Sequence, residues 1–284
     1  MHYGIVVPNI GTFADPFWLI ELACEAEKQG WDGFFLWDTL HFAAEGQQVC
    51  DPWVALAAIA MRTTRLRLGT LVTPLARRRP WKLARETVTL DQLSHGRLTL
   101  GIGLGDITDK GFSAVGETLD AKVQAQIVDE GLEVLTGLWS GQPVTYHGQH
   151  YQVEDLAFLP GPVQSPRIPI WIGGYWPRKG PLRRAARWDG IYPGKINPDG
   201  TLSDLAPLDV VALKDTITQF RSSEEPFDIV LGGRTPGDNP EQASKHLKPL
   251  VEAGATWWVE QLNSRRGTPE MTMQRIQQGP PSLL

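Results

Sequence analysis

Short apolar runs alternate with longer amphipathic stretches along the chain, and this alternation predicts the fold class. Eight of the runs have the apolar and β-branched character of buried strands, and helical patterns fill most of the gaps. Eight such units without a break favour a closed parallel (β/α)8 barrel, the TIM barrel of the α/β class, over an open doubly wound sheet. The expected strands are residues 3–7, 33–37, 66–72, 98–103, 169–172, 189–192, 227–231 and 256–259.

Proline marks several expected helix starts. Asp15-Pro16 and Asp51-Pro52 each place an aspartate at the N-cap and a proline at the first helical position. The glycine at position 30 then ends the first helix. Further helices are expected at residues 80–93, 120–139, 208–221 and 240–253.

One segment interrupts the alternation. Residues 141–164 follow the helix after the fourth strand and contain two short β-type runs. We expect this small insertion to form a β-hairpin lying over the barrel mouth. The length of 284 residues suits one barrel, and no linker divides it, so residues 1–284 are expected to form a single domain.

Composition and charge narrow the classes of partner. A net charge of −5 gives no reason to expect nucleic acid or an anionic membrane. No apolar run approaches the ~20 residues of a membrane span, and no signal-peptide pattern opens the chain, so a cytoplasmic protein is expected. The eleven tryptophans suit a wide cavity for a flat ligand as well as ordinary packing. Those near predicted strand ends are Trp37, Trp176, Trp257 and Trp258.

The loops after the strands hold the candidate chemistry, because barrel enzymes place catalytic groups at the C-terminal ends of their strands. The histidines lack the clustering of metal ligands, and no Gly-x-Ser-x-Gly motif occurs, so neither a metal site nor a nucleophilic serine is expected. Asp38 and His41 follow the second strand and are candidates for acid–base catalysis. His41 is the better one, because imidazole ordinarily titrates near neutral pH, although an isolated loop histidine is often structural.

Glycines mark two further strand ends. Gly101, Gly103 and Gly105 do not complete a dinucleotide-binding fingerprint, so they indicate either tight strand packing or close approach of the backbone to a ligand. Gly173 and Gly174 lead into a predicted helix, where exposed backbone N–H groups can bind phosphate. A simple turn is the alternative for this pair.

Several motifs together resemble the bacterial luciferase-like monooxygenases, a family of flavin- or F420-dependent oxidoreductases. The resemblance covers nearly the whole chain and implies a (β/α)8 barrel that uses reduced FMN or coenzyme F420 on a small-molecule substrate. It also implies a homodimer. The motifs are GWDGFFLWD at 30–38, LGTLVTP at 68–74, ARET at 84–87, LDQLSHGR at 90–97, IPIWIGG at 168–174 and AGATWW at 253–258.

The resemblance also implies roles for particular residues. Thr70-Leu71, beside Gly69, matches the place where relatives carry a non-proline cis peptide behind the flavin ring. A basic run and a second basic pair are candidates to meet the anionic tail of F420, although a solvated charge run is the favoured interpretation of the first. These cations are Arg77, Arg78, Arg79, Arg178 and Lys179. The remaining cofactor positions are Asn9 and Trp37 at the ring, Gly103 and Gly105 near the tail, and Gly173, Gly174 and Tyr175 in the phosphate loop.

One position departs from the family pattern. Many relatives have Asp-His after the second strand, whereas this chain has Asp38-Thr39 and places a histidine at position 41. Either His41 takes the place through a shift of the loop, or the acid–base step is handled differently. A second hypothesis is therefore a non-catalytic relative that binds a flavin or another small ligand.

Overall fold

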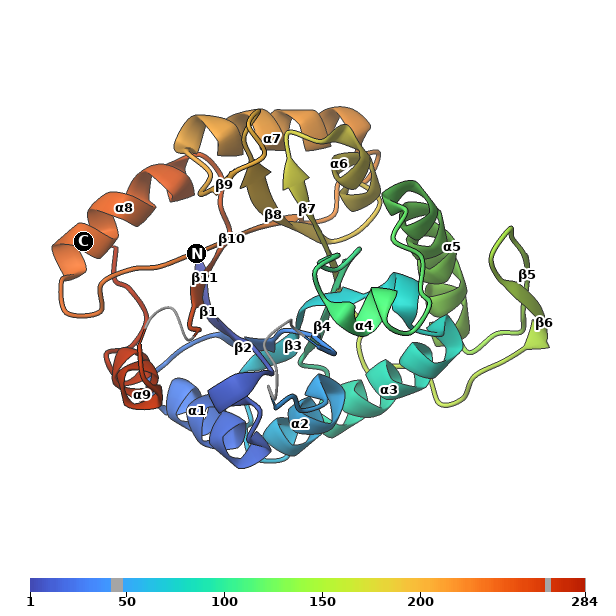
Figure 1. Cartoon of the computed structure of the whole chain (residues 1–284), viewed down its shortest axis with the longest axis horizontal. Helices are drawn as coiled ribbons and strands as arrows, with labels where there is room; N and C mark the ends of the chain where they lie inside the picture. Colours follow the sequence, from blue (N-terminus) through green and yellow to red (C-terminus); the bar gives the residue numbers. More distant parts are fainter. Residues whose placement is uncertain (42–47, 264–266, 284) are drawn as a thin grey trace.

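The computed structural model describes residues 1–41, 48–263 and 267–283, and its core is a closed ring of parallel strands (Figure 1). Within these residues, each of eight strands pairs in parallel with its neighbours, and the last pairing closes the ring. The (β/α)8 barrel is confirmed, and the open sheet is excluded. The strands in order around the ring are β1 (His2–Val7), β2 (Gly33–Leu36), β3 (Arg67–Pro74), β4 (Leu98–Gly103), β7 (Ile170–Trp176), β8 (Gly190–Ile196), β10 (Asp228–Gly233) and β11 (Trp257–Gln261).

Helices surround the ring, and two of them begin at the expected aspartate caps. The carboxylate of Asp15 accepts from the N–H of Phe17 at 2.9 Å, and that of Asp51 accepts from the N–H of Trp53 at 2.9 Å. The last helix was not expected, although Thr268 caps it in the same manner. The helices are α1 (Pro16–Lys28), α2 (Pro52–Ala60), α3 (Pro80–Leu93), α4 (Lys110–Ser113), α5 (Ala121–Trp139), α6 (Lys179–Ala185), α7 (Pro207–Phe220), α8 (Pro240–Glu252) and α9 (Pro269–Gln277).

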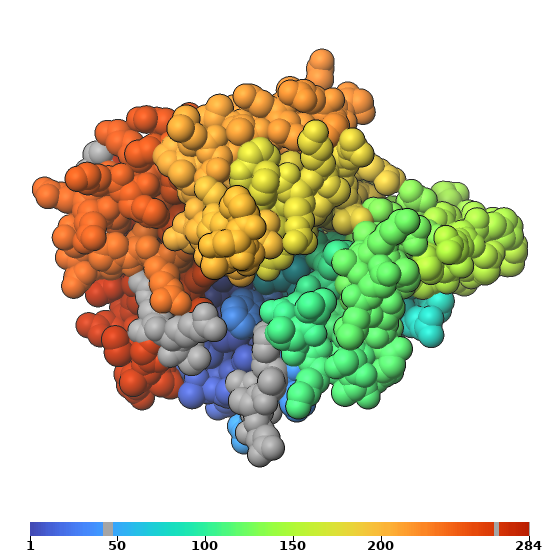
Figure 2. Space-filling view, turned by 45° about the horizontal axis from the view of Figure 1, so that its top comes forward, coloured from blue at the N-terminus to red at the C-terminus, as the bar shows by residue number. Residues whose placement is uncertain are grey.

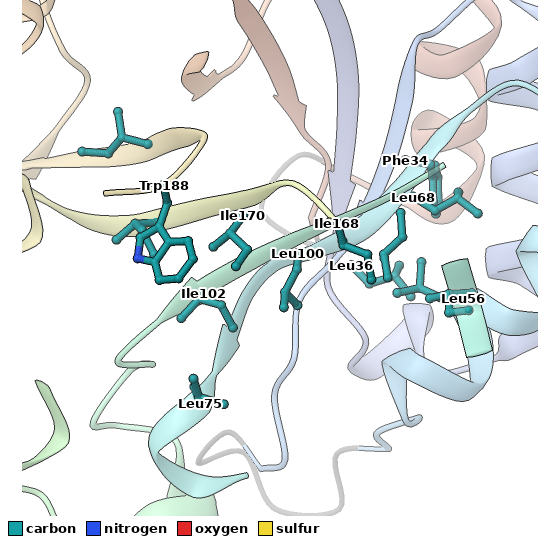
Figure 3. Close-up of a cluster of buried hydrophobic side chains, with 14 of the residues drawn as sticks. Phe34, Leu36, Leu56, Leu68, Leu75, Leu100, Ile102, Ile168, Ile170 and Trp188 are labelled. Atoms are coloured by element: carbon teal, nitrogen blue, oxygen red, sulfur yellow. The ribbon is translucent and has the colours of Figure 1, made fainter. Parts of the chain in front are cut away.

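Alternate residues of each strand point to opposite sides of the barrel wall, and both sides are packed. Outward residues such as Phe34 and Leu100 meet the helices in the cluster of Figure 3. Inward residues fill the barrel with aromatic rings. The ring centroids of Phe35 and Trp171 lie 5.5 Å apart, and those of Trp171 and Trp257 lie 5.2 Å apart. The barrel is therefore a filled core rather than a pore.

The hairpin in the insertion exists, but its expected place over the barrel mouth was wrong. The antiparallel strands β5 (Val144–His147) and β6 (Gln152–Leu156) project from the side of the molecule (Figures 1 and 2). The Glu130 carboxylate on α5 accepts hydrogen bonds from backbone N–H groups at the hairpin turn, including that of His150 at 2.8 Å. The insertion follows a helix that returns to the start of the next strand. The hairpin is consequently remote from the strand C-terminal ends.

Candidate active site

The upper end of the barrel, where the strands finish, brings β3, β4 and β7 together around Val72. A Cβ atom added at Gly103 would lie 2.5 Å from Val72 Cγ2, and one added at Gly173 would lie 2.9 Å from Val72 Cγ1. A Cβ atom at Gly174 would lie 2.2 Å from the Cβ of Pro181. Side chains are therefore excluded at these strand ends, and the backbone forms a cradle there. Such a cradle fits a flat cofactor that approaches the main chain closely.

A backbone irregularity in β3 places Val72 in this position. The non-proline cis peptide expected at Thr70-Leu71 lies one residue later, between Leu71 and Val72. The pairing of β3 with β4 shifts register between Thr70 and Thr73, whose hydroxyl oxygens lie 2.8 Å apart. Gly69 has a different role, because its Cβ atom would lie 1.9 Å from the Thr99 carbonyl oxygen. Close packing of β3 on β4 explains that glycine.

Asn9 lies buried beneath the loops and joins two of them. Its Nδ2 donates to the carbonyl oxygens of Thr39 at 2.9 Å and Cys50 at 2.7 Å. Its Oδ1 accepts from the N–H of Thr39 at 3.2 Å. Both amide hydrogens are therefore used within the protein. Trp37 is half-buried and packs on the aromatic interior of the barrel.

Asp38 is fully buried and is held in place by several donors. Arg78 binds it in a bidentate manner, with Nε at 2.8 Å from Oδ2 and Nη2 at 2.7 Å from Oδ1. The Thr73 hydroxyl donates to Oδ2 at 2.9 Å, and Arg77 donates to the Asp38 main-chain oxygen. The interaction with the carboxylate raises the pKa of Arg78 above its ordinary value, against the lowering effect of its burial. Asp38 is thus one half of a buried ion pair.

Asp109 completes the same charged cluster. Its Oδ2 lies 2.6 Å from Arg77 Nη1, and its carboxylate accepts from the N–H groups of Leu40 and His41 at 3.0 and 2.8 Å. Burial favours a higher pKa for this carboxyl, but Arg77 and the backbone donors outweigh it and hold the pKa below its ordinary value. We call Asp38, Arg77, Arg78 and Asp109 the arginine network.

The expectation of a solvated charge run was wrong for two of its three arginines. The side chains of Arg77 and Arg78 are only 2% and 17% exposed, whereas Arg79 is exposed. The network connects the loops after β2 and β3 with α4. Sequence reasoning missed Asp109, which lies outside every motif, and Val72, which lies inside the 68–74 motif but next to the residues that were singled out there.

The remaining predicted residues lie at the same end of the barrel. His41 is exposed, and its main chain is fixed through Asp109 and the N–H of Lys110. Tyr175 is 42% exposed, and burial of its ring raises the pKa of its phenol, with a further rise from Asp106. Gly105 has a φ of +87°, which favours glycine at this turn.

Three of the four candidate tryptophans have other roles. Trp176 Nε1 donates to Asp209 on α7 at 3.2 Å, and Trp258 Nε1 donates to the buried Glu260 at 3.0 Å. Trp257 stands at the start of β11, which is the opposite end of the barrel. These three are explained by packing or by position rather than by the upper site.

The described part of the chain holds neither a cluster of metal ligands nor a membrane-spanning helix. Across residues 1–41, 48–263 and 267–283, no three His, Cys, Asp or Glu side chains are grouped so as to hold a metal ion. In the same ranges, no helix combines the length and apolar character needed to cross a lipid bilayer.

The fold is that of the α/β-barrel proteins, a class in which active sites lie at the strand C-terminal ends, where this chain has its glycine-lined cradle. The model of one family, described as luciferase-like monooxygenase, matches residues 10–277. This chain therefore belongs to the luciferase-like monooxygenase family, as its motifs implied.

Individual relatives support the same placement. An uncharacterized protein of Mycobacterium tuberculosis is 30% identical over 239 residues, which are 78% of this chain and 82% of that protein. An F420-dependent glucose-6-phosphate dehydrogenase of Nakamurella multipartita is 31% identical over 253 residues, 84% of this chain and 72% of that one. The solved structure of an F420-dependent secondary alcohol dehydrogenase, in complex with an F420–acetone adduct, shares the fold. Its TM-score is 0.78 at 15% identity, covering 100% of this chain and 99% of that one.

Proposed function

We propose that this protein is an oxidoreductase that binds a flavin-type cofactor, coenzyme F420 or FMN, on its upper end and acts on a small organic substrate. The observation that carries the proposal is the cradle around Val72. Gly103 and Gly173 flank this side chain, and neither position has room for a Cβ atom. A flat ring placed against Val72 would meet backbone on both sides.

Each group at this end then has a part in holding the cofactor. When bound, the cofactor ring would supply hydride transfer or oxygen activation, and the protein would orient the cofactor and exclude water. We assign the cofactor phosphate to the backbone of Gly173 and Gly174, with the cations Arg178 and Lys179 next in the chain. We assign Trp37 to the border of the ring and Tyr175, which follows the two glycines within β7, to the border of the phosphate.

Two residues were expected to serve acid–base catalysis, and their surroundings favour different roles. Both carboxylate oxygens of Asp38 already accept charged or hydroxyl donors. We therefore assign Asp38 as a positioning residue that fixes the loop after β2. His41 is exposed in that same loop, so it is the group we propose to move a proton.

F420 is the first choice of cofactor, because a relative that is 31% identical is named as F420-dependent. FMN is the second choice, since the family includes enzymes of both kinds.

Loss of turnover in a His41→Asn variant with unchanged cofactor affinity would separate catalysis from binding alone. Unchanged turnover in that variant would remove His41 from the mechanism.

The experiment is a spectroscopic titration of the purified protein with FMN and with F420. We expect a spectral change and retention of one cofactor on gel filtration. A Gly173→Ala variant should bind it at least roughly tenfold more weakly, because displacing the cradle removes several kcal/mol of contacts. Gly137→Ala, on α5, is the matched control. Its Cβ atom would meet only the Val144 side chain, at 3.3 Å. No response to either cofactor would reject the proposal.

A further inference from the structure

A separate cavity opens at the lower end of the barrel, where the strands begin. Its volume is about 430 Å³, within the range of small-molecule sites. The aromatic layer of Phe35, Trp171 and Trp257 lies above it and fills the barrel between this cavity and the upper end. The cavity is therefore distinct from the cofactor cradle. Its lining includes His2, Arg67, Thr99, Trp171, Asp228 and Trp257.

Two charged side chains in this lining depart from the usual core of a barrel. Arg67 begins β3 and Asp228 begins β10, and these strands lie opposite each other in the ring. Inward positions of such barrels are ordinarily filled by branched apolar residues. Departures from local folding rules concentrate at functional sites, where binding compensates for their cost.

The partners of these two charges are neutral. Arg67 donates from Nε to the Thr99 hydroxyl at 2.9 Å and from Nη2 to Gln164 Oε1 at 3.3 Å. Asp228 accepts from the Thr256 hydroxyl at 2.8 Å and from Trp171 Nε1 at 3.2 Å. Burial lowers the pKa of Arg67 and raises the pKa of Asp228, and the charge of each only partly offsets the effect on the other. Each is a partly desolvated charge that gains from a ligand of opposite sign.

The other two charges of the lining differ in position and partners: Arg65 is exposed, and both Arg65 and Asp32 bind main-chain groups. Arg65 donates to the main-chain oxygens of Glu27 and Trp31 at 2.7 and 3.0 Å. Asp32 accepts from the N–H of Tyr3 at 2.8 Å and lies 3.8 Å from the imidazole of His2. The cavity thus presents a cation and an anion on facing walls.

Aromatic rings form the rest of the surface. The His2 imidazole lies over Trp257 with 4.8 Å between ring centroids, and its side chain is 62% exposed at the rim. The ring of Trp171 meets Trp257 edge-on. A flat apolar group therefore has aromatic surface to pack against, beside the two charges.

We propose that this cavity binds an aromatic α-amino acid. The carboxylate would pair with Arg67, the ammonium group with Asp228, and the ring would pack on the tryptophans. Such a zwitterion carries both charges and the flat body in one molecule. It neutralises two desolvated groups at once, which a simple anion or cation does not.

Calorimetric titration of the purified full chain with L-phenylalanine, L-tyrosine and L-tryptophan tests the proposal. At least one should bind with a Kd below about 1 mM. Three probes each lack one feature: L-alanine the ring, 3-phenylpropionate the ammonium group and phenethylamine the carboxylate. Each should bind at least roughly tenfold more weakly than the amino acid that binds best, because a charged hydrogen bond or an aromatic contact is lost.

Variants assign the site. Arg67→Gln and Asp228→Asn should each weaken binding at least roughly tenfold, whereas Asp215→Asn, on the exposed face of α7, should bind as the unaltered protein does. Circular dichroism checks folding. If Arg67→Gln does not fold, Asp228→Asn and the three truncated probes still decide. Absence of binding by all three amino acids, or equal binding by Asp228→Asn, overturns the proposal. Cofactor affinity at the upper end should not change in either variant, so this test is independent of the proposed oxidoreductase activity.

Discussion

Both ends of the barrel place an aspartate near an arginine, fully buried for Asp38 and half-buried for Arg67 and Asp228, but the two ends use these charges differently. At the upper end, Arg78 binds both oxygens of Asp38, and Arg77 joins Asp109 at 2.6 Å. At the lower end, Arg67 and Asp228 face a common cavity, and their hydrogen-bond partners are neutral side chains. Burial of a charge does not by itself identify a ligand site. The two ends differ in whether the hydrogen-bond partners of each charge are themselves charged or neutral.

The upper arrangement acts as a scaffold. A buried ion pair barely improves stability over an apolar pair, yet losing one partner leaves an uncompensated charge. Asp38 and Asp109 each bind an arginine from the segment after β3, so they tie the start of the loop after β2 and the N-terminus of α4 to that segment. At the lower end this compensation is only partial, and the two charges are available to an incoming ligand.

The largest expected effect tests the scaffold. Asp38→Asn leaves the buried Arg78 without its counter-ion, so the free energy of unfolding should fall by about 3 kcal/mol. Urea denaturation at pH 7 measures this loss. The matched variant Asp215→Asn replaces an exposed aspartate and should change stability by less than about 0.5 kcal/mol. A similarly small effect of Asp38→Asn would break the comparison, because Asp38 would then not depend on its pairing.

A pH profile sharpens the same contrast at Asp109. Its folded-state pKa is held below the ordinary value of 3.8, so its stabilising contribution is complete above that value. The contribution is lost as pH falls through the lower, folded-state pKa. Asp109→Asn should therefore cost about 2 kcal/mol at pH 7, the scale of a hydrogen bond to a charged group.

The difference between the unaltered protein and Asp109→Asn should then shrink at acid pH. Urea denaturation at a series of pH values between neutrality and the acid limit of folding follows it. Other carboxyls with lowered pKa values, such as Glu27, contribute equally to both proteins and cancel in the difference. A difference that stays constant down to the acid limit would show that Asp109 acts through shape alone.

The sequence predicted the barrel well, because its evidence is local. Each strand was visible as an apolar run, and the caps at Asp15 and Asp51 formed as expected. The helix α9 was missed although Thr268 and Pro269 carry the same signal. The hairpin strands were recognised, but periodicity says nothing about the side of a barrel on which an insertion packs.

The candidate sites were less predictable, because their contacts are distant in sequence. Asp38 and Arg78 are 40 residues apart, and Arg77 and Asp109 are 32 apart. No periodicity pairs them, so the arginines were interpreted as exposed or as tail-binding. Family motifs located the cis peptide to within one residue but did not reveal Val72 at the centre of the cradle. Arg67 and Asp228 sit at strand starts, where catalytic groups are not sought.

The smallest expected effect has the opposite sign and completes the comparison. Burial raises the folded-state pKa of Asp228 above its ordinary 3.8, so this group stabilises the fold when protonated. That contribution is complete below the ordinary pKa and is lost as pH rises through the folded-state pKa. At pH 7 the ionised carboxylate therefore weakens the folded state. Asp228→Asn removes the charge, while the amide oxygen can still accept from Trp171 Nε1 and the Thr256 hydroxyl can turn to accept from the amide.

We accordingly expect Asp228→Asn to raise the free energy of unfolding by about 0.5 kcal/mol at pH 7. This is the lower end of the net contribution of one hydrogen bond to stability. Urea denaturation without added ligand measures it, and the gain should vanish below pH 3.8, the ordinary value of the carboxyl. The same Asp-to-Asn change would then destabilise one end of the barrel and stabilise the other. A loss comparable to that of Asp38→Asn would mean that Asp228 supports the fold as Asp38 does. The lower cavity would in that case be another scaffold, and its charges would have no need of a ligand.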